Sequence, residues 1–343
     1  MNTSNKAIWI SAANVISCLG VIFLHCNSVF WSFPKGRLWV TSNFIETFFF
    51  FPVPVFFMIT GATLVNYRER YTTLVFLKKR FQRTLIPFLF WSLMALVYRI
   101  LADGYRIASL RDVFNDIVTT NLFSVYWFFI PLFAIYLSLP LISAVSKELR
   151  INVFGYIAII TFALNSVLPT LLGLAKISFN TAIQPPVSQG YILYILIGYI
   201  ISNIELSKRQ RLIIYAGGVL GWLVHFGGTS ILSQNAGEIV GTFKGYLNFP
   251  AVMHSIGVFV LFKHFPWEKV ICNSDRTIVK LSTYTFGIYL MHFFFVLSIP
   301  RLMGIDVANV GWRLLGPFVI FVLCAVLSKV FSKIPIFHYL IGV

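Results

Sequence analysis

Long runs of apolar residues alternate with short polar segments along the whole chain. Each run is about 20 residues long, the length that a helix needs to cross the hydrocarbon core of a bilayer. There are ten such runs, at residues 7–27, 44–66, 84–102, 124–144, 151–173, 188–203, 211–232, 246–264, 278–299 and 310–332. The ends of the sixth and seventh are the least well marked, because one is short and the other contains two glycine pairs. The pattern predicts an all-α, polytopic membrane protein with about ten transmembrane helices.

The composition supports this prediction and excludes a soluble class. Of the 343 residues, 58% are hydrophobic and 11% are charged, whereas soluble domains are nearer half apolar and a quarter charged. No segment between the runs is long enough to fold separately. We therefore expect residues 1–343 to form a single integral-membrane domain.

The positive charge is unevenly distributed among the predicted loops. If the chain starts in the cytoplasm, two thirds of its 27 Lys and Arg residues lie in cytoplasmic segments. This bias follows the positive-inside rule and predicts that both termini are cytoplasmic. It also accounts for the net charge of +16 without a nucleic-acid partner. The four cysteines form no CxxC pair, so we predict neither a disulfide framework nor a metal site.

Ionisable residues at a membrane boundary are candidates for chemistry, because placing a charge in a bilayer is costly. His25 ends the first run, Glu46 lies at the start of the second, and a short loop joins the two. A carboxylate that accepts the imidazole N–H raises the basicity of the ring, as a general base requires. The alternative is that both are solvated residues at the interface. Asn14, halfway along the first run, needs a hydrogen-bond partner or a cavity.

The second run contains two prolines, Pro52 and Pro54, which remove backbone donors and bend a helix. Broken helices in membrane proteins usually line cavities. Gly61, further along the run, permits close approach of another helix. We expect this run to border a cavity, with ordinary close packing as the alternative.

A basic cluster at residues 78–83 precedes the third run. Arg80 and Arg83 are one helical turn apart and face the same way. Two guanidinium groups at the beginning of a helix can bind a phosphate or pyrophosphate, with help from the helix dipole. Lys79 adds a third positive charge. The alternative is an anchor that only fixes the orientation of the chain.

Five segments, taken in order, carry a resemblance to a known family. They are Val21–His25, an apolar stretch ending in histidine; Val55–Gly61, which contains Phe-Phe-x-x-Thr-Gly; Arg80–Arg83 with Pro87, an Arg-x-x-Arg followed by proline; Tyr126–Phe129 with Pro140, an aromatic span; and Thr285–His292, which contains Gly-Ile-Tyr-Leu-x-His. Each segment alone is a weak signal. Together they resemble the acyltransferase-3 family of membrane acyltransferases over essentially the full length.

The resemblance implies transfer of an acyl group, usually acetyl from the co-substrate acetyl-CoA, to a hydroxyl of a surface polysaccharide or its lipid-linked precursor. It implies that His25 is catalytic, and Glu46 would orient its ring. Lys79, Arg80 and Arg83 would serve the donor. The expected partners are the glycan and membrane lipid, and the expected location is a bacterial inner or plasma membrane.

Weaker expectations concern the surroundings of the reacting carbonyl. Thr60 and Tyr289 are candidates to stabilise an oxyanion, and Asn14, Trp127 and His292 are candidates to contact substrate. Asn14 departs from the family pattern, because the family often has an arginine near this position. The side-chain amide of asparagine has no positive charge and cannot replace the two-pronged guanidinium group.

The length of the first run creates a problem for this mechanism. His25 lies 18 residues beyond residue 7, or roughly 27 Å along a helix, and the hydrocarbon core is itself roughly 30 Å thick. The donor arm must therefore reach deep into the bundle, or an acyl relay must cross it. A transporter or flippase of lipid-linked or acylated saccharides is the alternative function, and a scaffold for glycan synthesis is a third.

Overall fold

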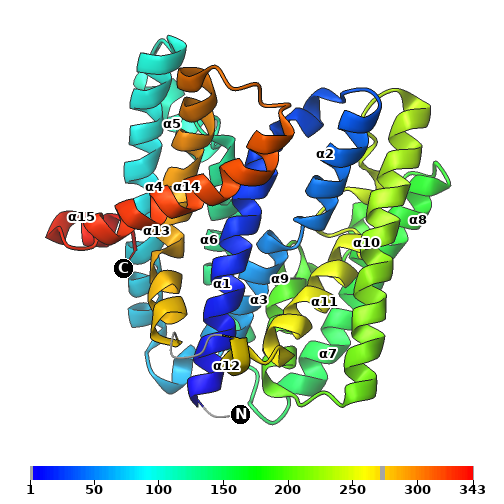
Figure 1. The fold of residues 1–343 in the computed structure, drawn as a ribbon. Coiled ribbons are helices and arrows are strands. Elements are labelled where there is room, and N and C mark those ends of the chain that lie inside the picture. The colour runs from blue at the N-terminus through cyan, green and yellow to red at the C-terminus, as the bar shows by residue number, and fades with distance from the viewer. Residues whose placement is uncertain (1–2, 271–274, 343) are drawn as a thin grey trace.

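The computed structural model describes residues 3–270 and 275–342, and within these ranges every regular element is a helix (Figure 1). The long helices are α1 (Thr3–Cys26), α2 (Arg37–Phe48), α3 (Pro52–Leu64), α4 (Thr73–Asp103), α6 (Phe129–Ile142), α7 (Arg150–Thr161), α9 (Ile192–Asn203), α10 (Lys208–Ala236), α11 (Phe249–His264), α13 (Asp275–Met303) and α14 (Val310–Phe331). The shorter elements used below are η1 (Ser28–Ser32), α5 (Leu110–Val118), η3 (Ser124–Phe128), the π-helix η4 (Phe162–Val167), α8 (Leu168–Leu174), η7 (Gly241–Phe243), α12 (Trp267–Val270) and α15 (Pro335–Leu340).

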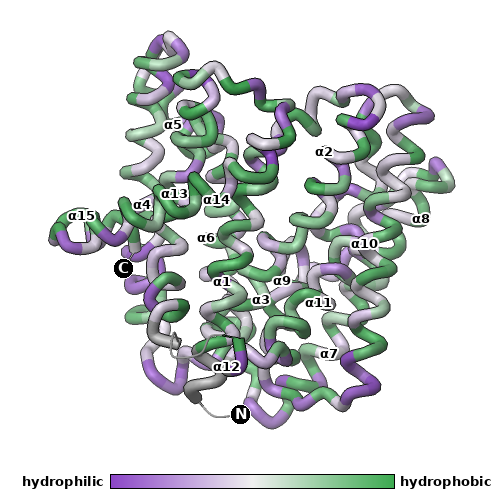
Figure 2. The backbone as a smooth tube through the Cα atoms, viewed as in Figure 1, coloured by the Kyte–Doolittle hydropathy of each residue, from purple (hydrophilic) through white to green (hydrophobic). Residues whose placement is uncertain are grey.

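Eight helical segments of the described chain are long and apolar enough to cross a membrane, by length and composition. The ten predicted runs all fall on apolar helices, but two of these, α9 and α11, have only 12 and 16 residues. Both are shorter than their predicted runs, because separate turns precede them, and Pro250 lies in the first turn of α11. Hydrophilic residues gather toward the two ends of the bundle (Figure 2). The cytoplasmic location of the termini remains a prediction.

The helix α4 begins at Thr73, well before the start of the predicted run at residue 84. Its first turn is capped by Thr72, whose side chain accepts a hydrogen bond from the Val75 N–H at 3.4 Å. Arg80 therefore lies roughly 10 Å from the beginning of the helix. The prediction that the helix dipole assists the arginines is wrong, because this effect is confined to the first turn.

The predicted break in the second run is confirmed. α2 ends at Phe48, and Pro52 occupies the first turn of α3. α3 then packs tightly on α9 through two glycines: a Cβ atom at Gly61 would lie 2.0 Å from the Ile195 carbonyl oxygen, and one at Gly198 would lie 2.0 Å from that of Met58. No side chain fits in either position, so the two backbones are in direct contact.

α1 lies at the centre of the molecule and contacts α2, α3, α11, α13 and α14. It runs parallel to α13 in a nearly constant register. The Ser282 hydroxyl donates to Ser11 Oγ at 3.1 Å, and the Cys18 thiol donates to the Thr285 carbonyl at 3.5 Å. This register brings His25, at the end of α1, to the level of His292, which lies 11 residues before the end of α13.

Candidate active site

A cavity of about 300 Å³ collects four of the residues predicted from the sequence. Asn14 comes from α1, Thr60 from α3, Arg80 from α4 and Tyr289 from α13. Four separate helices therefore contribute one of these predicted residues each. The remaining wall consists of Phe56, Ile59, Thr84, Phe128, Leu132, Tyr136, Thr285 and Phe286.

Two histidines meet at the end of the α1–α13 pair. The ring centroids of His25 and His292 are 5.2 Å apart, and the ring of Phe293 lies edge-on to His25 at 5.6 Å. His292 is fully buried, and its Nδ1 bonds to the Tyr289 carbonyl. Its Nε2 is buried without a partner among the described residues. A carbonyl only accepts hydrogen bonds, so the proton of a neutral His292 is on Nδ1 and its Nε2 is an acceptor.

The cavity reaches almost to this histidine pair. Tyr289 lines the cavity, and its ring centroid is 5.6 Å from that of His292. The two residues are three apart on α13, which is roughly 4.5 Å of helix rise. The distance between the Arg80 side and the histidines is therefore largely spanned by the cavity.

The two hydroxyl groups that were predicted to stabilise an oxyanion already donate to backbone carbonyls. Thr60 Oγ1 donates to Phe56 O at 3.0 Å, and the Tyr289 hydroxyl donates to Val125 O. A hydroxyl has one proton, so neither group has a free donor for an oxyanion in this arrangement. Arg80 and Asn14 keep donors free, since no side-chain hydrogen bond of either is present among the described residues.

The basic residues of α4 differ in exposure, and only Arg80 of the predicted arginine pair lines the cavity. Arg80 is half-buried and lines the cavity, and its Nε is buried without a partner within the described chain. Arg83 and Lys79 are exposed, and Lys79 Nζ lies 3.8 Å from the centroid of the Tyr71 ring. One positive charge is therefore inside the mouth of the cavity, and two are outside it.

Comparison with known families gives a match to the acyltransferase domain family over residues 8–332. The chain belongs to the acyltransferase-3 family. No curated protein and no solved structure matches it. Together with its apolar helices, family membership makes the protein a multi-pass membrane protein and supports acyltransferase activity.

In this acyltransferase, Glu46 forms a buried ion pair with Lys244. Lys244 Nζ lies 2.7 Å from Glu46 Oε1, and each side chain is 4% exposed. The described hydrogen bond of Glu46 is thus to Lys244 and not to His25. The prediction that Glu46 orients the His25 ring is therefore not supported by this contact. The reason is the loop between α10 and α11, which carries an opposite charge into the bundle at this point. Burial lowers the pKa of Lys244, and Glu46 opposes this shift.

Trp127 lies beside the cavity of the acyltransferase, on the segment η3. Its ring stacks on that of Tyr246, with centroids 5.5 Å apart. Two reciprocal bonds fasten η3 to α13: the Tyr126 hydroxyl donates to Leu290 O at 2.7 Å, and the Tyr289 hydroxyl donates to Val125 O. The aromatic segment is therefore held rigidly against the helix that carries His292.

Sequence reasoning missed the pairing of the two histidines and the partner of Glu46. The only signal in the sequence for the partner of Glu46 was a lone lysine, Lys244, just before the apolar run 246–264. Three cysteines, Cys18, Cys26 and Cys324, are buried and free, and Cys272 lies outside the described residues. Within the described chain no group of three or more His, Cys, Asp or Glu residues is arranged to hold a metal ion.

Proposed function

We propose that this protein is a membrane O-acyltransferase that moves an acetyl group from cytoplasmic acetyl-CoA to a hydroxyl of a surface polysaccharide or its lipid-linked precursor, in a bacterial inner or plasma membrane. The observation that carries the proposal is the cavity, which joins the Arg80 guanidinium on one side to Tyr289, one helical turn from the paired histidines. A scaffold or an anchor has no use for such a connection.

The donor binds with its phosphates at the α4 surface. Arg83 and Lys79 are exposed there and attract the polyanion, while the half-buried Arg80 binds at the mouth with a planar guanidinium fork. The uncharged pantetheine arm then enters the cavity, whose wall is mainly apolar with few polar groups. Phosphates stay in water, and only the neutral part of the donor is desolvated.

His25 acts as the general base. It removes the proton from the acceptor hydroxyl while that oxygen attacks the thioester carbonyl. The carbon–sulfur bond then breaks, and the thiolate of CoA leaves and receives the proton from the imidazolium. We assign His292 as a positioning residue: its unpartnered Nε2 is an acceptor in the ring that lies beside His25, and an N–H donated to it by His25 would fix the tautomer of the reacting ring. Glu46 has no part in this step.

The cavity reduces the distance problem posed by the sequence. Along α1, Asn14 is 11 residues before His25, or roughly 16 Å, compared with roughly 27 Å for the whole helix. The donor arm begins at the level of Arg80 and Asn14, and not at the membrane surface. Direct transfer then needs no acyl relay.

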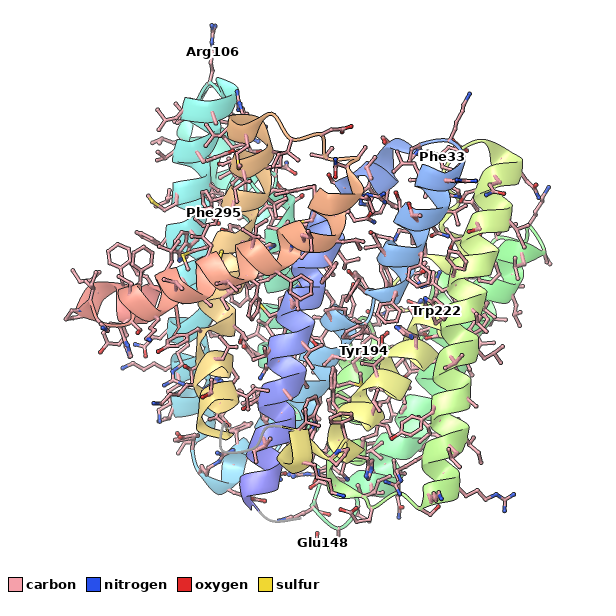
Figure 3. All side chains as sticks on the ribbon, viewed as in Figure 1. Phe33, Arg106, Glu148, Tyr194, Trp222 and Phe295 are labelled. Atoms are coloured by element: carbon pink, nitrogen blue, oxygen red, sulfur yellow. The ribbon has the colours of Figure 1, made fainter. Side chains whose placement is uncertain are left out.

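The test is transfer of labelled acetyl from acetyl-CoA to glycan in membranes that contain the wild-type protein or a variant. We expect His25→Ala to lower the rate about 10²- to 10⁴-fold, the usual contribution of general acid–base catalysis. We expect Arg80→Ala to raise the KM for acetyl-CoA. His338→Ala, in α15, and Arg106→Ala, exposed at the end of the molecule opposite Glu148 (Figure 3), are the matched controls.

The competing function gives a different result. Undiminished acetylation of the glycan in both His25→Ala and Arg80→Ala, measured by mass spectrometry, would refute the assignment. Loss of glycan export with acetylation intact would favour a transporter or flippase.

A further inference from the structure

A second, larger cleft of about 980 Å³ lies away from the cavity and shares no residue with it. It is formed by η1, the loop that leads to α2, and the C-terminal end of α10. Phe33, one of its residues, is at the end of the molecule opposite Glu148 (Figure 3). If the basic loops face the cytoplasm, this cleft faces outward. Three aromatic residues, Trp31, Phe33 and Trp39, lie in its wall together with the polar residues Ser32, Lys35, Gln234 and Glu238.

Trp31 is the most unusual residue of the cleft, because the residue is 62% exposed although its ring is held in place. The ring of Phe30 lies edge-on to it at 5.1 Å, and the Lys244 ammonium is 5.0 Å from its centroid. The buried Glu46–Lys244 pair, which the acyl-transfer step does not use, thus holds the indole ring through a cation–π contact.

The neighbouring backbone is strained. Phe33 has φ 47°, in the left-handed region, where a bulky residue is a true outlier. Its ring packs on that of Trp39, with centroids 4.5 Å apart. The Nε1–H of Trp39 is buried and has no partner among the described residues. Trp39 lines the cleft, so its unpaired donor adds a polar group to this aromatic wall.

We propose that this cleft binds the saccharide part of the acceptor, and the proposal rests on the proposed function. The C–H face of a sugar ring stacks on the open indole of Trp31, and its hydroxyls bond to Gln234, Glu238 and Lys35. A lipid chain would leave these polar groups desolvated without partners. The volume is in the upper part of the range of small-molecule sites, roughly 300–1,000 Å³.

The test uses the purified protein in lipid nanodiscs and a fluorescently end-labelled probe, the de-O-acylated envelope polysaccharide of the cells that make this protein. We expect Trp31→Ala to weaken binding about tenfold, which corresponds to about 1.4 kcal/mol, and to raise the KM for glycan by the same factor with kcat unchanged. Trp31→Tyr keeps an aromatic face and should recover most of the affinity. Phe114→Ala, an equally exposed aromatic residue on α5, is the control and should bind as wild type.

The outcomes separate this proposal from the proposed function. If the wild-type protein transfers no acetyl group but Trp31→Ala still loses glycan binding, the cleft stands and the acyl-transfer assignment falls. If acetyl transfer proceeds and Trp31→Ala binds glycan with wild-type affinity and KM, the cleft proposal is overturned. It is also overturned if Trp31→Ala and Phe114→Ala weaken binding equally, because both would then act only as interfacial anchors.

Discussion

The ring of His292 is fixed at one nitrogen and free at the other. The Tyr289 carbonyl holds Nδ1, and the unpartnered Nε2 is in the ring that lies beside His25. A ring held in this way can set the tautomer of its neighbour without touching substrate. The two imidazole rings therefore have different proposed roles: His25 is the base, and His292 orients it.

This inequality predicts the kinetics of the two substitutions. His292→Ala should lower kcat about 10- to 100-fold, the loss typical of a residue that orients another, and leave the KM for acetyl-CoA unchanged. The loss in His25→Ala should be larger. Both parameters come from steady-state acetyl transfer in proteoliposomes. Full activity in His292→Ala would show that the ring contact has no catalytic role.

The Glu46–Lys244 pair predicts an effect on stability. Removing one partner leaves a buried charge unpaired, which costs about 3–5 kcal/mol. Glu46→Gln should therefore lower the temperature of thermal unfolding in detergent strongly, and Glu46→Gln combined with Lys244→Met should recover much of the loss. If Glu46 instead orients His25, the double variant would regain stability without regaining acetyl transfer, and the measured kcat distinguishes the two roles.

Among the elements, the contact between α3 and α9 is the least tolerant of change. Gly61→Ala would force a Cβ into the Ile195 carbonyl, so the helices must move apart, at a cost of about 1–3 kcal/mol. Gly155→Ala, on α7 where a Cβ meets nothing within 4 Å, is the matched control. It should be neutral or stabilise by up to about 1 kcal/mol. Equal unfolding temperatures for the two variants would contradict the close packing.

The sequence was sufficient for the helices and for much of the cavity. Apolar runs locate the helices because a bilayer demands internally bonded backbone, and Pro52 and Gly61 signal a break and a close contact. The start of α4 could not be predicted, because the basic cluster at residues 78–83 separates the four apolar residues of its first turn, 74–77, from the apolar run that begins at residue 84. The helices α9 and α11 are shorter than their predicted runs because separate turns precede them. The apolar pattern does not show where these turns end and the helices begin.

Side-chain partners depend on how the helices assemble, which no single run contains. Four candidates, Asn14, Thr60, Arg80 and Tyr289, do line one cavity. Sequence proximity favoured Glu46 as the partner of His25, since a short loop joins their helices. The parallel packing of α1 on α13 brings His292 there instead, from the far end of the chain.

For the whole molecule, the proposed function makes the cavity the route of the acyl group between its two ends. Thr60→Phe places a ring in the 300 Å³ space and should lower acetyl transfer at least about tenfold, because a misplaced donor costs more than the contact itself. The protein should still fold, since the new ring fills empty volume. Thr63→Phe, one turn along α3 and outside the cavity, is the control. Unfolding temperatures of the two variants should agree while their acetyl-transfer rates differ. If a folded Thr60→Phe protein transfers acetyl at the wild-type rate, the acyl group does not pass through this cavity. The cavity would then not connect the donor site at Arg80 to the histidine pair.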